Sequence, residues 1–302
     1  MLLAAAGAAP GAVHYVTVAG YGHEQDYEQR FSGWAKEIDK ILRGSGGEAR
    51  VTTLSGGDAT RAKLTEALAE AARQAKPEDA FVLMLIGHGT FDGAEYKFNL
   101  RGPDIAGIEL AALLDRIPAG RQLVVNMTSA SGGSIPALQR PNRVVIAATK
   151  TGTEKNATVF ARYWVEALRD PGADQDKNES VSALEAFVYA DKKTAGFYET
   201  QKRIATEHAV IEDTGQGAGV RAAAVESGQG QAAARFPLLR IGSAQRAASD
   251  PAKRQLLERK EAVEQQIDKL KYEKAAMPTE VYRKQIAALL LELARLQQEL
   301  DK

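Results

Sequence analysis

The chain has 302 residues, 39 basic and 39 acidic side chains and no cysteine, so its formal net charge is zero. A neutral balance without a basic run does not favour nucleic acid as a partner. The missing cysteines exclude disulfides and thiolate metal sites. Beyond the N-terminus no run of 18 apolar residues occurs, so no membrane span is predicted.

The first 13 residues, MLLAAAGAAPGAV, form a short apolar stretch that ends in small residues. This pattern is typical of the end of a secretory signal, although the basic region that normally precedes it is missing. Two interpretations stay open. The stretch is a signal remnant of a protein exported to the periplasm, or it is a flexible N-terminus of a cytoplasmic protein.

Five short segments carry the pattern of β-strands. They are apolar or β-branched and lie at 14–20, 49–54, 81–86, 122–127 and 143–149. The third and fourth are continuous apolar runs, which is typical of parallel strands buried on both faces. A further strand at 236–241 is predicted to close the sheet as its sixth strand.

Helical spacing of apolar residues connects these strands. Helices are predicted from Tyr27 to Ile41 and at 108–117, 158–169 and 181–208. Another helix is predicted to end at Gln74 and to begin after an N-cap, which is either Asp58 or Thr60. Strands that alternate with helices indicate a doubly wound α/β fold. An Asp92-Gly93 turn indicates a hairpin within 90–104, 171–177 is predicted to be a polar linker, and 209–234 a loop.

Two of the buried strands end in clusters of small polar residues. The sequence GHG at 87–89 follows the third strand, and TSASGG at 128–133 follows the fourth. In parallel sheets the ligand crevice lies beyond the carboxyl ends of the strands. We therefore expect His88 to lie near a hydroxyl from the second cluster, across this crevice.

The composition changes at the C-terminus. Residues 251–302 are almost free of glycine and carry Leu, Ile and Val at spacings of three, four and seven, which resembles a coiled coil. Pro278 interrupts this pattern, because proline is tolerated only in the first turn of a helix. One kinked helix is the simpler interpretation. The pattern favours a helical hairpin that docks on a second copy of the chain or on a partner protein.

The motifs IGHGTFDG…YKFNL, TSASGGS and AATKTGTEKNATVFARYWVEAL resemble the caspase and legumain clan of cysteine peptidases (clan CD). They are most similar to the bacterial legumain-like group (peptidase family C13). The resemblance covers 14–245. It implies a caspase-like three-layer α/β sandwich with a mostly parallel six-stranded sheet. It also implies that the nucleophilic cysteine of the family has been replaced. The hairpin predicted at 251–302 from its own pattern lies outside the resemblance.

The resemblance assigns roles to the residues of the two clusters. It implies that His88 is the base and that Ser129 stands at the nucleophile position, or Thr128 if the register slips by one. Gly89, Ser131 and Gly132 would then line the cleft or the oxyanion hole. Glu154 matches the glutamate that lines the substrate pocket in legumain-like enzymes, and Asp92 is a second candidate for this pocket.

A hydroxyl is a weaker nucleophile than a thiol and needs an aligned base that a third group orients. No acidic residue is marked as such a partner for His88. We therefore expect a catalytically silent peptidase homologue, a pseudoenzyme that binds a peptide or protein. The alternatives are an active Ser–His peptidase and a scaffold that acts through its C-terminal hairpin.

No cofactor and no metal site is predicted. His208 and the pair Glu212-Asp213 are interpreted as a solvated helix end, since the Thr-Gly-Gln-Gly that follows lacks the alternating carboxylates of a calcium loop. The glycine-rich segments lack the endings of a nucleotide-binding loop.

Overall fold

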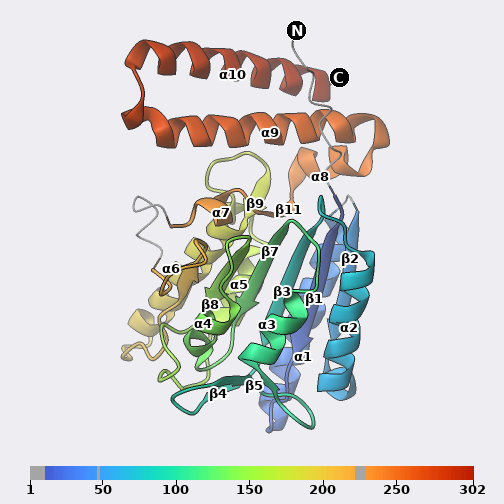
Figure 1. Cartoon of the computed structure of the whole chain (residues 1–302), viewed down its shortest axis with the longest axis vertical. Coiled ribbons are helices and arrows are strands. Elements are labelled where there is room, and N and C mark those ends of the chain that lie inside the picture. Colours follow the sequence, from blue (N-terminus) through green and yellow to red (C-terminus); the bar gives the residue numbers. More distant parts are fainter. Residues whose placement is uncertain (1–10, 46–47, 222–228) are drawn as a thin grey trace.

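The computed structural model describes residues 11–45, 48–221 and 229–302. Its centre is a six-stranded sheet in the order β10-β8-β7-β3-β1-β2, in which only β10 runs antiparallel to its neighbour (Figure 1). The strands are β1 Val13–Ala19, β2 Ala49–Leu54, β3 Ala80–Ile86, β7 Arg121–Asn126, β8 Arg143–Ala147 and β10 Val210–Glu212. The predicted fold class is confirmed. Residues 1–10 of the N-terminal apolar stretch, for which two interpretations were open, lie outside the described part.

Helices cover both faces of the sheet, because each central strand is apolar on both sides. Val82 and Met84 of β3 join one core cluster, whereas Phe81 and Leu83 join the other. The first cluster lies under α1 Gln25–Gly44, α5 Phe160–Ala167 and α6 Ala183–Thr200. The second lies under α2 Arg61–Gln74, α3 Gly107–Leu114 and α4 Ile135–Leu138. This alternation along one strand produces the three layers.

Local capping places several of these boundaries. The side chain of Thr60, not that of Asp58, caps α2 and accepts from the backbone N–H of Lys63.

Beyond β3 the chain forms a small antiparallel sheet of β4 Gly89–Phe91, β5 Tyr96–Phe98 and β6 Ile105–Ala106. Asp92 closes the β4–β5 turn by accepting from the backbone of Ala94 and Glu95. The predicted hairpin is confirmed.

Two predictions for the second half are wrong. The sixth strand of the main sheet is β10, which lies in the segment that we predicted to be a loop. The segment predicted to close the sheet forms β11 Pro237–Arg240, which pairs instead with β9 Ser180–Ser182 in a separate two-stranded sheet. These strands have three or four residues, too few for a periodic pattern, and their pairing partners are distant in the sequence.

The long helix predicted for 181–208 is shorter at both ends. Ser182 and Glu185 form a capping box, so α6 begins at Ala183. The helix ends at Thr200, and Lys202 has a positive φ of 51°. The following residues run back toward α5, where the carboxylate of Glu207 accepts from the backbone N–H groups at its first turn. The segment after α6 therefore caps the N-terminus of α5 and does not continue α6 as a helix.

The C-terminal segment forms a pair of helices, α9 Pro251–Glu273 and α10 Thr279–Leu300, as expected from the position of Pro278. Their common seam contains Val263, Ile267, Leu296 and partly buried residues around them. None of the described helices is long and apolar enough to cross a membrane.

This helix pair lies at one end of the molecule, whereas β4 and β5 lie at the opposite end (Figure 1). A short helix, α8 Gly242–Ser249, links it to the α/β part. Three alanines of α8 pack against Leu257 of α9. The guanidinium of Arg240 donates to both carboxylate oxygens of Glu261, at 2.6 and 2.9 Å.

Candidate functional site

The carboxyl ends of β3 and β7 lie side by side, because these strands are parallel neighbours in the sheet. The N–H of Met127, directly after β7, donates to Leu85 O at 2.9 Å. On the other side of β3, the N–H of Gly20 donates to Ile86 O at 2.8 Å. The segments that carry His88 and Ser129 therefore leave the sheet at the same edge, as the sequence predicted.

Ser129 is 3% exposed, and its hydroxyl is bound to the backbone of Gly89. The Oγ accepts from the N–H of Gly89 at 3.2 Å and donates to the carbonyl oxygen of the same residue at 3.3 Å. Gly89 is thus placed beside the candidate nucleophile, as expected of a cleft residue. Its N–H is directed at the hydroxyl instead of at a substrate oxygen.

Thr128, the alternative nucleophile, is fully buried in a polar network. Its Oγ1 donates to Asn126 Oδ1 at 2.8 Å and lies 2.6 Å from the hydroxyl of Tyr96. Asn126 in turn donates to the Oγ of Ser134 at 3.0 Å. Burial raises the pKa of Tyr96, although its hydrogen bonds to Thr128 and Asn126 act in the opposite direction. This network connects the end of β7 to β5 and holds the Thr128 hydroxyl inside the protein.

The imidazole of His88 is half-buried among aromatic rings of α1 and of the loop before it. The ring of Tyr27 lies 4.7 Å from it, centroid to centroid, that of Phe31 5.1 Å and that of His23 6.3 Å. In the part of the chain that the structure describes, the imidazole makes no hydrogen bond to the hydroxyl of Ser129 or Thr128.

Burial lowers the pKa of His88, and the positive potential of His23 lowers it further, while a hydrogen bond to the Gly22 backbone opposes both. Both effects favour the uncharged form of the imidazole. Among the described residues no carboxylate hydrogen-bonds to it. The orienting group of a catalytic triad would instead favour the imidazolium and raise the pKa.

We therefore expect the imidazole of His88 to titrate below the ordinary histidine pKa of about 6.5. Two-dimensional ¹H–¹³C NMR spectra recorded against pH measure this, with His88→Gln used to assign the signal. A His88 pKa above the ordinary value would contradict this prediction, since the carboxylate of Glu24 and the Gly22 backbone would then have to outweigh burial and His23.

Ser131 and Gly132 connect the loop after β7 to the loop after β8. The N–H of Thr149 donates to Ser131 Oγ at 3.0 Å, and the N–H of Gly132 donates to Thr149 Oγ1 at 2.9 Å. A Cβ at Gly132 would lie 2.4 Å from the carbonyl carbon of Lys150, so only glycine fits there. Ala130, which lies between Ser129 and Ser131, is buried and has a positive φ of 55°, a strained conformation for a residue with a side chain.

Glu154 and Asp92, the predicted pocket residues, occupy different surroundings. The carboxylate of Glu154 accepts from the N–H of Lys150 at 2.8 Å and lies 2.5 Å from Nδ1 of His208. The backbone oxygen of Glu154 also accepts from the N–H of Ala130, which brings Glu154 next to the loop after β7 that carries Ser129. Asp92 is exposed and closes the β4–β5 turn.

The interpretation of His208, Glu212 and Asp213 as a solvated helix end is wrong. His208 is half-buried and paired with Glu154, and the two acidic residues are buried. Glu212 accepts from the N–H groups of a tight turn that follows it, and Asp213 accepts from the first N–H groups of α7 Gln231–Ala234. The bonds of Asp213 reach 19 and 20 residues along the chain, and capping over such a distance leaves no signal in the local sequence.

Sequence reasoning also missed Tyr96, Asn126 and Thr149, which hold the candidate site together. Asn126 carried a signal, since it is the polar residue at the end of an apolar strand. Tyr96 and Thr149 carried none, because their partners become neighbours only when the sheet forms.

No protein-family model matches the chain, and no curated protein sequence matches it. Solved structures with a similar fold include the following two. The Drosophila initiator caspase Dronc is 10% identical, with a TM-score of 0.46 over 70% of this chain and 82% of that one. The protein GSU0716 from Geobacter sulfurreducens is 16% identical, with a TM-score of 0.46 over 70% of this chain and 97% of that one. Neither likeness tells what this chain binds or cleaves.

Proposed function

We propose that the protein is a catalytically silent homologue of caspase- and legumain-like peptidases. It binds a peptide or a protein at the carboxyl edge of its sheet. The observation that carries this proposal is the state of Ser129, whose hydroxyl hydrogen-bonds to both backbone groups of Gly89 inside the protein.

Attack on a peptide carbonyl by Ser129 requires more than a rotation of its side chain. Two hydrogen bonds to Gly89 must break, and a buried hydroxyl must reach the solvent. The base must then come within about 2.6–3.2 Å of the oxygen and be held there by a third group. His88 packs against Tyr27 and Phe31, and no carboxylate among the described residues hydrogen-bonds to its imidazole. These features support a site that has kept its architecture without the chemistry.

The surface beside His88 is suited to binding. The ring of Tyr21 lies 4.4 Å from that of His23, and Arg30 places its guanidinium 4.5 Å from the centroid of Tyr27. His23 and Arg30 are exposed and the two tyrosines are partly exposed. Tyrosine and arginine are enriched among the residues that dominate protein–protein and protein–peptide affinity. An aromatic or acidic side chain of a peptide would find partners here.

Exposure of the full chain to a diverse peptide library tests the proposal. Products and retained peptides are both read by mass spectrometry. We expect retention without cleavage, with retention lowered at least tenfold by Tyr27→Ala or His88→Ala. Tyr272→Ala, an exposed tyrosine of α9 at the other end of the molecule, is the matched control and should change nothing.

Cleavage that is lost in both His88→Ala and Ser129→Ala would overturn the proposal in favour of an active Ser–His peptidase. Cleavage that survives Ser129→Ala and is lost in Thr128→Val would assign the nucleophile to Thr128.

A scaffold that acts through the helix pair is the second candidate. The observation in its favour is that α10 exposes Leu290 and Leu291, which are 50 and 55% exposed, in addition to the residues of its seam. If the α/β part neither cleaves nor retains peptides, that result would favour the scaffold role.

A further inference from the structure

The segment between α5 and α6, part of which we predict from the sequence to be a polar linker, has a regular pattern of oxygen-bearing residues. Asp174, Asp176, Asn178, Ser180, Ser182 and Glu185 occupy positions 1, 3, 5, 7, 9 and 12 of a twelve-residue stretch, DQDKNESVSALE. The calcium loop of EF-hand proteins uses this spacing, and it likewise lies between two helices.

The loop departs from that pattern at position 6, where EF-hand loops have glycine and this chain has Glu179. Glu179 nevertheless adopts a positive φ of 66°, the left-handed conformation for which glycine is selected there. Its N–H donates to Oδ2 of Asp174 at 3.1 Å. The turn that folds position 6 back toward position 1 is therefore formed without glycine.

Three carboxylates converge in this loop. Asp174, Asp176 and Glu185 each place a carboxylate oxygen within 4.8 Å of those of the other two. Lys177, the cation within the loop, donates to the backbone oxygen of Asp174 at 2.5 Å and not to one of these carboxylates. A shared cation would neutralise their mutual repulsion.

An independent observation concerns Asp174. It is only 3% exposed, and its Oδ2 accepts from the N–H of Glu179. Its Oδ1 is buried and has no hydrogen-bond partner among the residues that the structure describes. Leaving an acceptor of a charged group buried and unpaired is costly, so such an atom normally has a ligand. Asp174 stands at position 1, the first metal ligand of the EF-hand pattern.

We propose that this loop binds one calcium ion. The side chains of Asp174, Asp176, Asn178 and Glu185 and the backbone oxygen of Ser180 supply the oxygen ligands. A flexible loop of six or more oxygen donors suits calcium, whereas magnesium demands a rigid octahedron and retains water. In this structure the carboxylate of Glu185 accepts from the backbone N–H groups of Gln175, Asp176 and Ser182. On binding the ion, it would give up some of these hydrogen bonds and coordinate the calcium instead.

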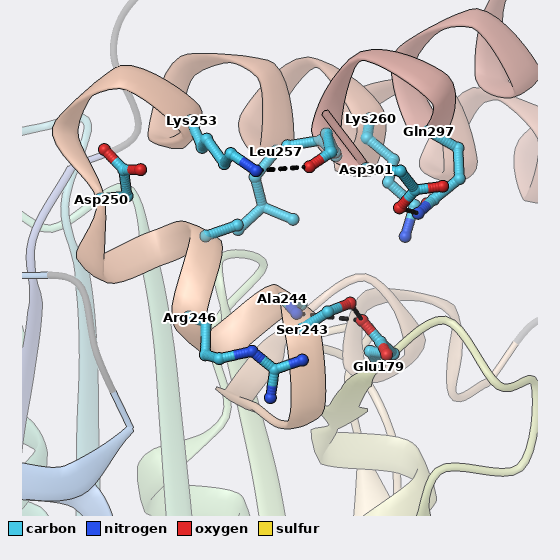
Figure 2. Close-up of a pocket in the computed structure, with 12 residues that line it drawn as sticks. Glu179, Ser243, Ala244, Arg246, Asp250, Lys253, Leu257, Lys260, Gln297 and Asp301 are labelled. Carbon is cyan, nitrogen blue, oxygen red and sulfur yellow. Dashed lines mark hydrogen bonds between the residues drawn. The ribbon is translucent and has the colours of Figure 1, made fainter.

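The proposed site lies next to the attachment of the helix pair. The carboxylate of Glu179 accepts from Ser243 and from the N–H of Ala244 at the start of α8, as Figure 2 shows. Strand β9, which contains Ser180, pairs with β11 directly before α8. Strand β9 lies at the end of the molecule that carries the helix pair, whereas β4, which follows His88, lies at the opposite end (Figure 1).

Calorimetric titration of CaCl₂ into chelator-treated full-length protein tests the proposal. We expect one site with a dissociation constant of about 10⁻⁷–10⁻³ M, the range of sensor and extracellular calcium loops. Asp174→Asn, Asp176→Asn and Glu185→Gln should each weaken binding at least tenfold. Asp268→Asn on α9 is the matched control and should bind as the unaltered protein does. MgCl₂ should bind at least tenfold more weakly than CaCl₂.

Asp176 is exposed and glutamine preserves the capping role of Glu185, so these variants should fold, which circular dichroism verifies. In parallel, the thermal midpoint of the unaltered protein should rise by several degrees with CaCl₂ and not with MgCl₂. Absence of both heat and thermal shift up to about 10 mM, above the weakest calcium modules, would overturn the proposal. So would binding that all three variants retain, or equal affinity for magnesium.

Discussion

Replacement of Gly89 by alanine is expected to lower the free energy of unfolding by about 3 kcal/mol, the upper part of the usual cost of overpacking. A Cβ at this position would lie 2.5 Å from Cε2 of Tyr96, 2.6 Å from the backbone oxygen of Ser129 and 2.7 Å from Oγ1 of Thr128. Two of these atoms belong to the two candidate nucleophiles, so the loop after β7 would have to move. Equilibrium unfolding in urea measures the change.

Gly33→Ala is the matched control for this experiment. Gly33 lies within α1 and its Cβ would meet nothing within 4 Å, so alanine should raise stability by about 0.4–1 kcal/mol. A Gly89→Ala variant as stable as the unaltered protein would mean that the loop carrying Ser129 is not pressed against β4. The hydroxyl of Ser129 would then be free to leave Gly89, and the case for a silent site would lose its main support.

Truncation of the chain after Ser249 is expected to leave the cooperative unfolding of the remainder within a few degrees of its original midpoint. In the described parts of the chain, neither of the two main core clusters contains a residue of 251–302. The deletion removes the contact of Leu257 with α8, the ion pair of Arg240 with Glu261, and the bonds of Arg254 to Glu48 and to Ala248 O. All of these lie at the periphery of the α/β part.

The same truncation should abolish any self-association, which light scattering after size-exclusion chromatography measures as a fall in mass. This follows from our prediction that 251–302 docks on a second copy or on a partner protein. The double variant Leu290→Glu, Leu291→Glu separates the two effects, since both side chains are exposed and their exchange should leave the thermal midpoint unchanged. A truncated protein that unfolds or aggregates would show instead that the helix pair belongs to the core.

The sequence alone was sufficient for the elements whose pattern is local and long. Six apolar residues in a row at 81–86 predict a buried parallel strand, and a helical stripe from Tyr27 to Ile41 predicts α1. The order of strands and helices then placed His88 and Ser129 at neighbouring strand ends. No structure was needed for this, because consecutive parallel strands with helical connections tend to be neighbours in the sheet.

Only the tertiary structure decided which short segments pair and what each polar side chain contacts. Strands β9, β10 and β11 have three or four residues each, and long-range hydrogen bonds select their positions. The same holds for the site. The sequence places Ser129 near His88, but the two hydrogen bonds of Ser129 to Gly89 and the aromatic contacts of His88 arise from the packing of β4 and α1 around the strand ends. Chemistry depends on distances of tenths of an ångström, which local sequence patterns do not encode.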